Sequence, residues 1–195
     1  MPEQYLNCKK KISRNKIDLY LFYSYYSKYI CSSKFIYSLE NGKELEIVFE
    51  SDNFPHLLGL HKFNKISSIG KAEDIVNEII CKNISMKELK RIDRSIFNEP
   101  TMLDRLTFFP TLRTILDSSQ FLIEFDGTKC IPTKISANYF LYSDEINVTI
   151  FLAIREIDKL SNRIICCPVS FLVDRFNKFQ KNKQTHISIK KINTE

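Results

Sequence analysis

Residues 35–50 read FIYSLE-NG-KELEIVFE, two alternating runs of apolar and polar residues that are separated by Asn41-Gly42. An Asn-Gly pair between such runs predicts a β-hairpin, because a type I′ turn needs positive φ at both central residues. In the second run the apolar side chains alternate with acidic ones, so one face of this strand is expected to be buried. The hairpin therefore indicates an antiparallel sheet in this fold.

Helical patterns flank the hairpin on both sides. Before it, residues 17–30 (IDLYLFYSYYSKYI) have the apolar spacing of a well-buried helix. After it, SDNFPHLLGLHK offers N-cap side chains, an early proline and Gly59, which should shorten the helix or allow a close backbone approach. Three further helices are predicted at residues 71–82, 85–92 and 110–118.

From residue 120 the period changes from helix to strand. QFLIEF, KISANYFLY, INVTIFLAIRE and RIICCPVSFLV read as successive strands, and THISIKKI reads as a final edge strand whose lysines discourage pairing. A short helix at residues 172–182 is expected to join that last strand to the others. We predict an α+β fold, with a helical N-terminal and middle part packed on an antiparallel β-sheet.

Length and composition favour one globular domain. The 195 residues contain 44% hydrophobic residues, enough for a sizeable core. We expect a single domain over 1–195, divided into a helix and hairpin at 17–50, a helical middle at 51–119 and a sheet at 120–192. No stretch approaches the roughly 18 apolar residues that span a bilayer, and no secretory signal is visible, so a soluble cytoplasmic protein without a membrane partner is expected.

The six cysteines are scattered and form no Cys-x-x-Cys pair, so neither a disulfide framework nor a zinc site is indicated. Buried, reduced cysteines are the better interpretation, including Cys166-Cys167 within an apolar run. The sequence calls for no cofactor, because phosphate-binding glycine loops and zinc-hydrolase motifs are also missing.

The charge is distributed unevenly along the chain. Residues 1–34 contain seven Lys and Arg against two acidic residues, and residues 159–195 contain eight against two, whereas residues 35–158 contain 14 against 19. If the two basic ends lie near each other, they form a positive face able to hold phosphates. The alternative is a solubilising fringe of lysines.

The segment FPHLLGLHK is the main candidate for chemistry. It places His56, His61 and Lys62 within seven residues, and histidine is the natural proton shuttle near neutral pH. The alternative is a capped helix whose histidine is structural.

A second candidate group is dispersed over the predicted strands: Lys134, Tyr139, Arg155 and Ser170. Together these side chains could form a phosphate-holding concavity, although each alone is more typical of an ordinary surface group than of a ligand. Arg105, a polar residue in the apolar stretch LDRLTFFPTL, is either a substrate clamp or a partner for Asp104 or Glu99.

NFPHLLGLHKF after the hairpin resembles the fourth group of the phage-barnase-EndoU-colicin-RelE-like nucleases. The order of DRLTFFPTL, KISANYFLYSD, FLAIRE and CPVSFLVDRFNKFQ is also similar, so the resemblance spans residues 17–192. It departs from the family pattern at Asn138, where an acidic residue is expected.

The resemblance implies a barnase/EndoU/RelE-like fold and metal-independent cleavage of RNA, such as tRNA or mRNA, by a toxin or phage-defence effector with a cognate antitoxin or inhibitor. Carried over by motif, His56 is the acid or base, Arg105 and Lys134 hold the scissile phosphate, and Tyr139 and Ser170 line the pocket. His61, Lys62 and Arg155 are expected to bind the substrate. The alternative is a catalytically inactive RNA- or protein-binding module on the same fold.

Overall fold

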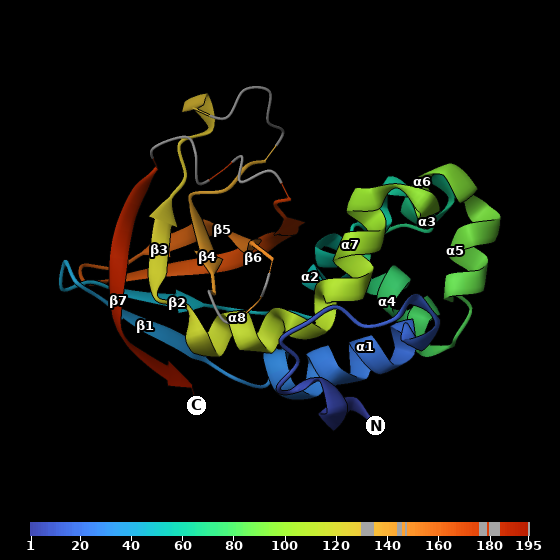
Figure 1. Cartoon of the computed structure of the whole chain (residues 1–195), viewed down its shortest axis with the longest axis horizontal. Helices are drawn as coiled ribbons and strands as arrows, with labels where there is room; N and C mark the ends of the chain where they lie inside the picture. Colours follow the sequence, from blue (N-terminus) through green and yellow to red (C-terminus); the bar gives the residue numbers. More distant parts are fainter. Residues whose placement is uncertain (130–134, 144–145, 147, 176–178, 180–183, 195) are drawn as a thin grey trace.

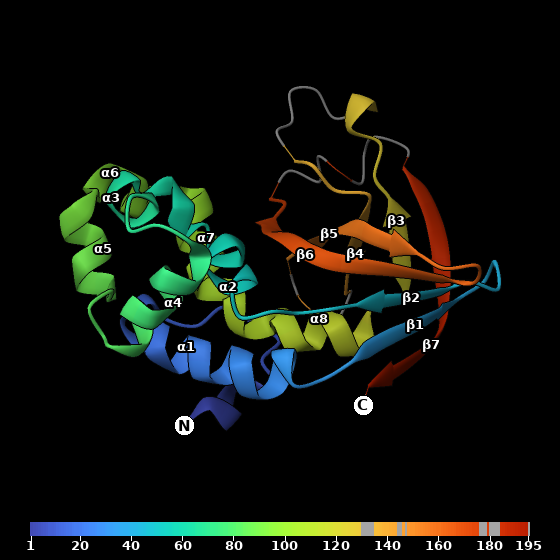
Figure 2. The ribbon, with the colours of Figure 1, turned by 180° about the vertical axis from the view of Figure 1, so that it is seen from behind.

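The computed structural model describes residues 1–129, 135–143, 146, 148–175, 179 and 184–194. A β-barrel occupies one side of the molecule and most of the helices the other (Figures 1 and 2). The helices of the described residues are α1 (Leu19–Tyr26), α2 (Asn53–Leu58), α3 (Asn64–Ser67), α4 (Ala72–Ile80), α5 (Met86–Ile92), α6 (Arg94–Asn98), α7 (Pro100–Phe108) and α8 (Leu112–Ser118).

The strands form a closed barrel in the order β1-β2-β6-β5-β4-β3-β7. Their bounds are β1 (Phe35–Leu39), β2 (Glu44–Ile47), β3 (Phe121–Glu124), β4 (Tyr139–Tyr142), β5 (Ile150–Lys159), β6 (Arg163–Val173) and β7 (Thr185–Thr194). Among the described strand pairs, β2 and β6 alone run parallel. The predicted α+β class is confirmed, but the sheet is closed and mixed rather than open and antiparallel.

The hairpin at residues 35–50 forms as predicted, with β1 antiparallel to β2. Its turn differs from the expected type I′, because Gly42 (φ +80°) has positive φ and Asn41 does not. Leu39 N–H donates to Lys43 O at 2.8 Å and Gly42 N–H to Leu39 O at 3.1 Å. This is the three-residue loop in which a left-handed glycine follows an ordinary turn.

Strand β7 corrects the prediction of a final edge strand. It pairs antiparallel with both β1 and β3 and so closes the barrel. A register shift at Ser38/Leu39 accommodates the pairing with β1. Lys190 and Lys191 are exposed. These lysines therefore lie on the outer surface of a closed barrel, and they do not protect an unpaired edge.

Strand β4 is shorter than predicted, since it begins at Tyr139. Asn138 just before it bridges two neighbours: its backbone N–H donates to Ile154 O and its side-chain Oδ1 accepts from Glu156 N–H, both at 2.9 Å. At this position an amide therefore has a structural role. The helix expected at residues 172–182 falls mostly outside the described residues, and Lys134 and Cys130 lie outside them too.

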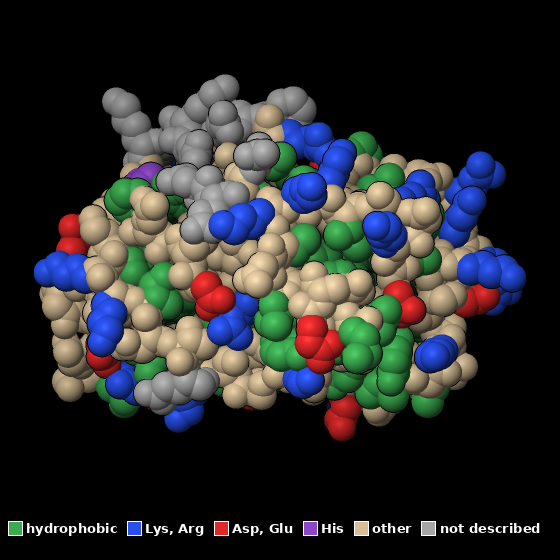
Figure 3. All heavy atoms as spheres, turned by 60° about the horizontal axis from the view of Figure 1, so that its bottom comes forward, with side chains coloured by type: hydrophobic (Ala, Val, Ile, Leu, Met, Phe, Trp, Pro, Cys, Tyr) green, Lys and Arg blue, Asp and Glu red, His purple; other side chains and the backbone are tan. Residues whose placement is uncertain are grey.

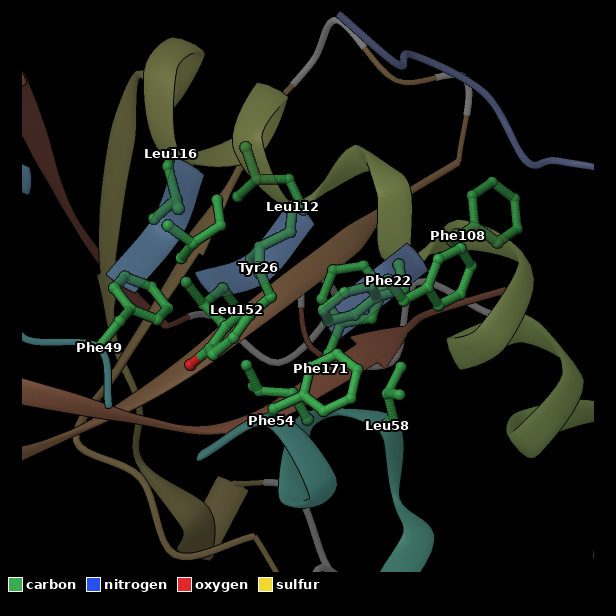
Figure 4. Close-up of a cluster of buried hydrophobic side chains, with 14 of the residues drawn as sticks. Phe22, Tyr26, Phe49, Phe54, Leu58, Phe108, Leu112, Leu116, Leu152 and Phe171 are labelled. Atoms are coloured by element: carbon green, nitrogen blue, oxygen red, sulfur yellow. The ribbon is translucent and has the colours of Figure 1, made fainter. Parts of the chain in front are cut away.

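One hydrophobic core joins the barrel to the helices. Figure 4 shows Phe22 and Tyr26 of α1, Phe54 of α2 and Phe171 of β6 meeting in one cluster. These four rings are fully buried, and Phe54 packs edge-on against the ring of Phe109 at 5.4 Å between centroids. Because α2 is anchored in this core, the segment that carries the histidines has a fixed position relative to β6.

The cysteines of the described residues are all free. Cys166 is buried in β6 as expected, whereas Cys81 is exposed, so the expectation of uniformly buried cysteines was wrong. No helix within the described ranges is both long and apolar enough to cross a membrane.

The two chain ends lie along the same side of the molecule (Figures 1 and 2). Figure 3 turns this side forward and shows lysines and arginines spread between acidic, apolar and neutral groups. The two chain ends therefore share one side of the molecule without meeting, and the described lysines and arginines form no concentrated patch there, which favours the solubilising fringe.

Candidate active site

Helix α2 presents its histidine to solvent because of its apolar spacing. Phe54, Leu57 and Leu58 are fully buried, and His56 lies on the opposite, exposed face. Pro55 sits in the first turn, where its missing N–H costs no hydrogen bond. The short helix thus fixes His56 at the edge of the core.

Gly59 ends α2 and turns the chain back toward His56. Its φ of +74° lies in the left-handed region that favours glycine, and its N–H donates to His56 O at 3.0 Å. A 3₁₀ turn, Leu60–Lys62, follows at once. The result is that the His56 and His61 rings lie 5.6 Å apart between centroids, tilted by 41°.

The environment of His61 favours its neutral form. Partial burial lowers the pKa of His61, and the nearby positive charges of His56, Arg105 and Lys62 lower it further. A neutral imidazole has a free nitrogen that can accept a proton. His61 is therefore suited to act as a base near neutral pH.

Arg105 of α7 packs against the backbone at Gly59. A Cβ at Gly59 would meet Arg105 Nη1 at 3.2 Å and Cδ at 3.3 Å, so the glycine makes room for the guanidinium group. Burial lowers the pKa of Arg105.

The two carboxylates considered as partners of Arg105 are engaged elsewhere. Asp104 Oδ2 accepts from Arg175 Nε at 2.6 Å, and Glu99 Oε2 pairs with Lys62 Nζ at 3.1 Å. Within the described residues Arg105 forms no ion pair, and this outcome favours the clamp interpretation over the pairing interpretation.

These groups line a cleft of about 440 Å³ between the helices and the outer face of β5 and β6. Its described lining comprises His56, His61, Lys62, Arg105, Ile135, Ser136, Arg155, Val169, Ser170 and Leu172. The structure therefore brings together six of the eight predicted site residues. Its positive charge comes from the acidic middle segment, since no Lys or Arg of the two basic ends is among these residues.

Two predicted site residues are not in this lining. Tyr139 lies apart, and its hydroxyl donates to Glu156 Oε2 at 3.4 Å. Burial, followed by the nearby Glu156 carboxylate, raises the pKa of Tyr139 to about 12. Lys134 lies outside the described residues, so its role stays a prediction. In the described part of the chain, no group of three or more His, Cys, Asp or Glu side chains could hold a metal ion.

The family described as phage-Barnase-EndoU-ColicinE5/D-RelE like nuclease4 matches residues 18–195. The chain belongs to this nuclease family. No curated protein and no solved structure matched it. The cleft of this nuclease contains two histidines and two arginines, and neither arginine forms an ion pair with a described residue. Such a concavity suits a phosphodiester.

Two residues of this nuclease that border the cleft, in a neighbouring hollow, were not predicted as site residues. Asp52 was expected to cap α2, but its side chain makes no capping hydrogen bond and lines a neighbouring hollow instead. Cys167 was expected in the strand core, yet it is half-buried in the same hollow. The i, i+4 spacing of Asp52 and His56, which places both on one face of a helical turn, was the available signal.

Proposed function

We propose that this protein is an endoribonuclease that cleaves RNA by attack of a ribose 2′-hydroxyl on the adjacent phosphorus. One observation carries the proposal: two imidazoles and two arginines, His56, His61, Arg105 and Arg155, face one cleft. Neither guanidinium has a carboxylate partner among the described residues, so both are available to a phosphate.

His61 acts as the base in this mechanism. As a neutral imidazole it accepts the 2′-hydroxyl proton, and the 2′-oxygen forms its bond to phosphorus while the bond to the 5′-oxygen breaks. His56 in its protonated form donates a proton to the departing 5′-oxygen. The products are a 2′,3′-cyclic phosphate and a free 5′-hydroxyl, and each proton transfer is worth roughly 10²–10⁴-fold in rate.

Arg105 and Arg155 stabilise the charge that builds on the phosphoryl oxygens. Donors aimed at developing charge often contribute the largest share of catalysis, and a half-buried arginine is less screened by water than an exposed one. Ser170, on β6 in the same cleft lining as Arg155, supplies a hydroxyl to the same oxygens. The chain's own residues thus provide acid, base and charge stabilisation.

The biological role that fits this chemistry is a cytoplasmic effector acting on tRNA or mRNA, such as a toxin or phage-defence protein restrained by an antitoxin. We expect growth arrest when the protein is expressed alone, relieved by His56→Ala. Harmless expression of active enzyme would argue against the effector role.

The deciding experiment incubates the purified full chain with total tRNA and a defined mRNA in the presence of EDTA, and maps the RNA ends. We expect cleavage that leaves 2′,3′-cyclic phosphate and is lost in His56→Ala. His186→Ala is the matched control, because this third histidine is exposed on β7, away from the cleft. Salt-sensitive RNA binding without cleavage would replace the proposal with the inactive binding module.

A further inference from the structure

A groove lies on the helical part of the molecule, beside the start of α1 and along α5, which Figure 1 shows at the end opposite the barrel. It consists of two adjoining hollows of about 260 and 480 Å³, which share Met86 and Lys87. None of the described residues that line these hollows lines the cleft. The groove is therefore a separate surface from the candidate active site.

The floor of the groove is apolar. Ile17, Ile79 and Ile84 line the first hollow, and Phe97 lines the second. Met86, which lines both, is half-buried in the first turn of α5. A methionine side chain adapts its shape to different neighbours, so it suits a surface that another molecule covers.

The rim of the groove is basic. Four exposed cations line the two hollows: Arg14, Lys82, Lys87 and Lys90. None of them forms an ion pair with a described residue. Asp18 is the one acidic residue in the described lining, and its Oδ1 already accepts the Leu21 N–H at 3.0 Å as the N-cap of α1. The groove thus has an excess of positive charge that the described chain leaves without a counter-charge.

Lys82 has a backbone conformation that a lysine rarely adopts. Its φ of +60° is the one positive φ among the described residues other than glycine. Its Nζ lies 4.9 Å from the centre of the Tyr20 ring, an exposed ring that also lines the first hollow. A left-handed lysine where glycine is favoured is strained, and such strain points to a role for the side chain.

The chemistry of the groove favours a protein segment over RNA or a membrane. RNA bases stack on free aromatic faces. Phe97 is buried, with the Arg14 guanidinium carbon 4.3 Å from its ring centre, and the ammonium group of Lys82 lies over Tyr20. A membrane takes up apolar groups that protrude, whereas these apolar groups line hollows. An acidic segment with apolar side chains on one face matches both the floor and the rim.

We propose that this groove is a docking site for an acidic amphipathic segment of a partner protein. Apolar side chains of the segment enter the two hollows, and its carboxylates pair with the four cations of the rim. Because the groove and the cleft share no described lining residue, the segment docks without entering the cleft. The inference goes beyond the proposed ribonuclease function and does not depend on it.

The test uses a synthetic helical peptide with leucines on one face and glutamates on the other, labelled with a fluorophore and titrated into the full-length protein. We expect saturable binding that weakens as salt is added, because exposed ion pairs are screened. Lys87→Glu combined with Lys90→Glu should weaken binding by about tenfold or more, since both changes place like charges opposite the glutamates. Lys190→Glu combined with Lys191→Glu is the matched control. It makes the same change of charge at two exposed lysines of β7 and should bind the peptide as the wild type does.

Three results would overturn the docking site. The first is the absence of saturable binding, and the second is an equal loss in the β7 control. The third is unchanged affinity for a peptide whose leucines are replaced by serines, because the apolar floor would then contribute nothing. Uncleavable 2′-O-methyl RNA or anionic phospholipid vesicles serve as competitors. If either binds the wild type more tightly than the peptide does, and loses binding in the Lys87/Lys90 variant, the groove belongs to RNA or to a membrane and the proposal fails.

Hydrogen exchange locates the peptide on the wild-type protein without any variant. Bound peptide should slow the exchange of amides in α5 and at the start of α1. Protection confined to other segments would contradict the proposal.

Discussion

The two walls of the cleft are built differently. The helical wall holds His56 on α2, His61 on the turn after it and Arg105 on α7. The buried residues Phe54, Leu58 and Leu106 connect these elements to the core. The strand wall holds Arg155, which is exposed on β5, and Ser170, which is half-buried on β6. Packing fixes the backbone that carries His56 and His61, although both imidazoles are exposed, and it half-buries Arg105. The second set of side chains stands at the surface of a regular sheet.

This difference between the walls indicates which part of the reaction needs precisely positioned groups. Proton transfer demands groups held within a fraction of an ångström of their working geometry. A turn anchored by the buried Leu58 and Leu60 holds the backbone of both histidines in place. Phosphate binding tolerates a mobile side chain, because a charge acts over a longer distance. We therefore expect substitutions in the helical wall to cost more than matched substitutions in the strand wall.

The largest effect is expected from the histidines. His56→Ala and His61→Ala should each lower kcat by roughly 10²–10⁴-fold, because each removes one proton-transfer group. Ser170→Ala across the cleft should lower kcat less than about tenfold, as one lost hydrogen bond does. Single-turnover cleavage of a defined RNA measures all three, and equal losses on both walls would break the comparison.

Arginine-to-lysine substitutions give the next largest contrast. Arg105→Lys should lower kcat by roughly 10²-fold, because a half-buried guanidinium aimed at the phosphate cannot be replaced by a point charge. Arg155→Lys should lower it less than about tenfold, since an exposed ammonium on a flexible chain still reaches the phosphate. A larger loss at Arg155 would assign the phosphate clamp to the strand wall.

Glycine substitutions test whether the turn after α2 sets the position of Arg105. Gly59→Ala should destabilise the protein by about 1–2 kcal/mol from its positive φ, and should also lower kcat by displacing Arg105. Gly42→Ala has a similar backbone strain (φ +80°) but no atom within 4 Å of its new Cβ. Gly42→Ala should lose comparable stability in a thermal melt while it keeps full kcat. Equal kcat in both variants would show that Gly59 does not set the position of Arg105.

The smallest effect is a shift in titration. Because the folded-state pKa of His61 lies below the ordinary histidine value, its proton binds more weakly in the folded protein, and stability is lost as pH falls below that ordinary value. NMR titration should give a His61 midpoint below about 6.5. Arg105→Gln should raise the midpoint without restoring the ordinary value, since burial is the largest cause. A His61 midpoint at or above the ordinary value would contradict the assignment as base.

Local patterns in the sequence predicted the elements of this fold better than their arrangement. The hairpin at residues 35–50 and a helix at residues 17–30 were predicted from turn chemistry and periodicity. Both are confirmed, with the α-helix found at Leu19–Tyr26. The parallel pairing of β2 with β6 and the closure of the barrel by β7 depend on contacts between distant segments. Alternation alone cannot distinguish an edge strand from one that closes a barrel, because both expose one face.

The candidate site was predictable where its residues are close in sequence. His56 and His61 belong to one short motif, and the turn at Gly59 brings their rings together. Arg105 was ambiguous, since only the structure shows that Asp104 and Glu99 are bound by Arg175 and Lys62. Asp52 was missed because a residue of this type before a helix predicts a cap, and burial without a partner is a tertiary property.

The closure of the barrel by β7 also determines when the chain can complete its fold during synthesis. Strand β1 is complete at Leu39, but its neighbour β7 begins at Thr185, so the two can pair only after almost 150 more residues have been synthesised. Contacts of such long range make folding slow and postpone it until the later segment is available. The barrel that supports the cleft therefore cannot close before β7 has emerged, so the cleft is completed only after that strand has been synthesised.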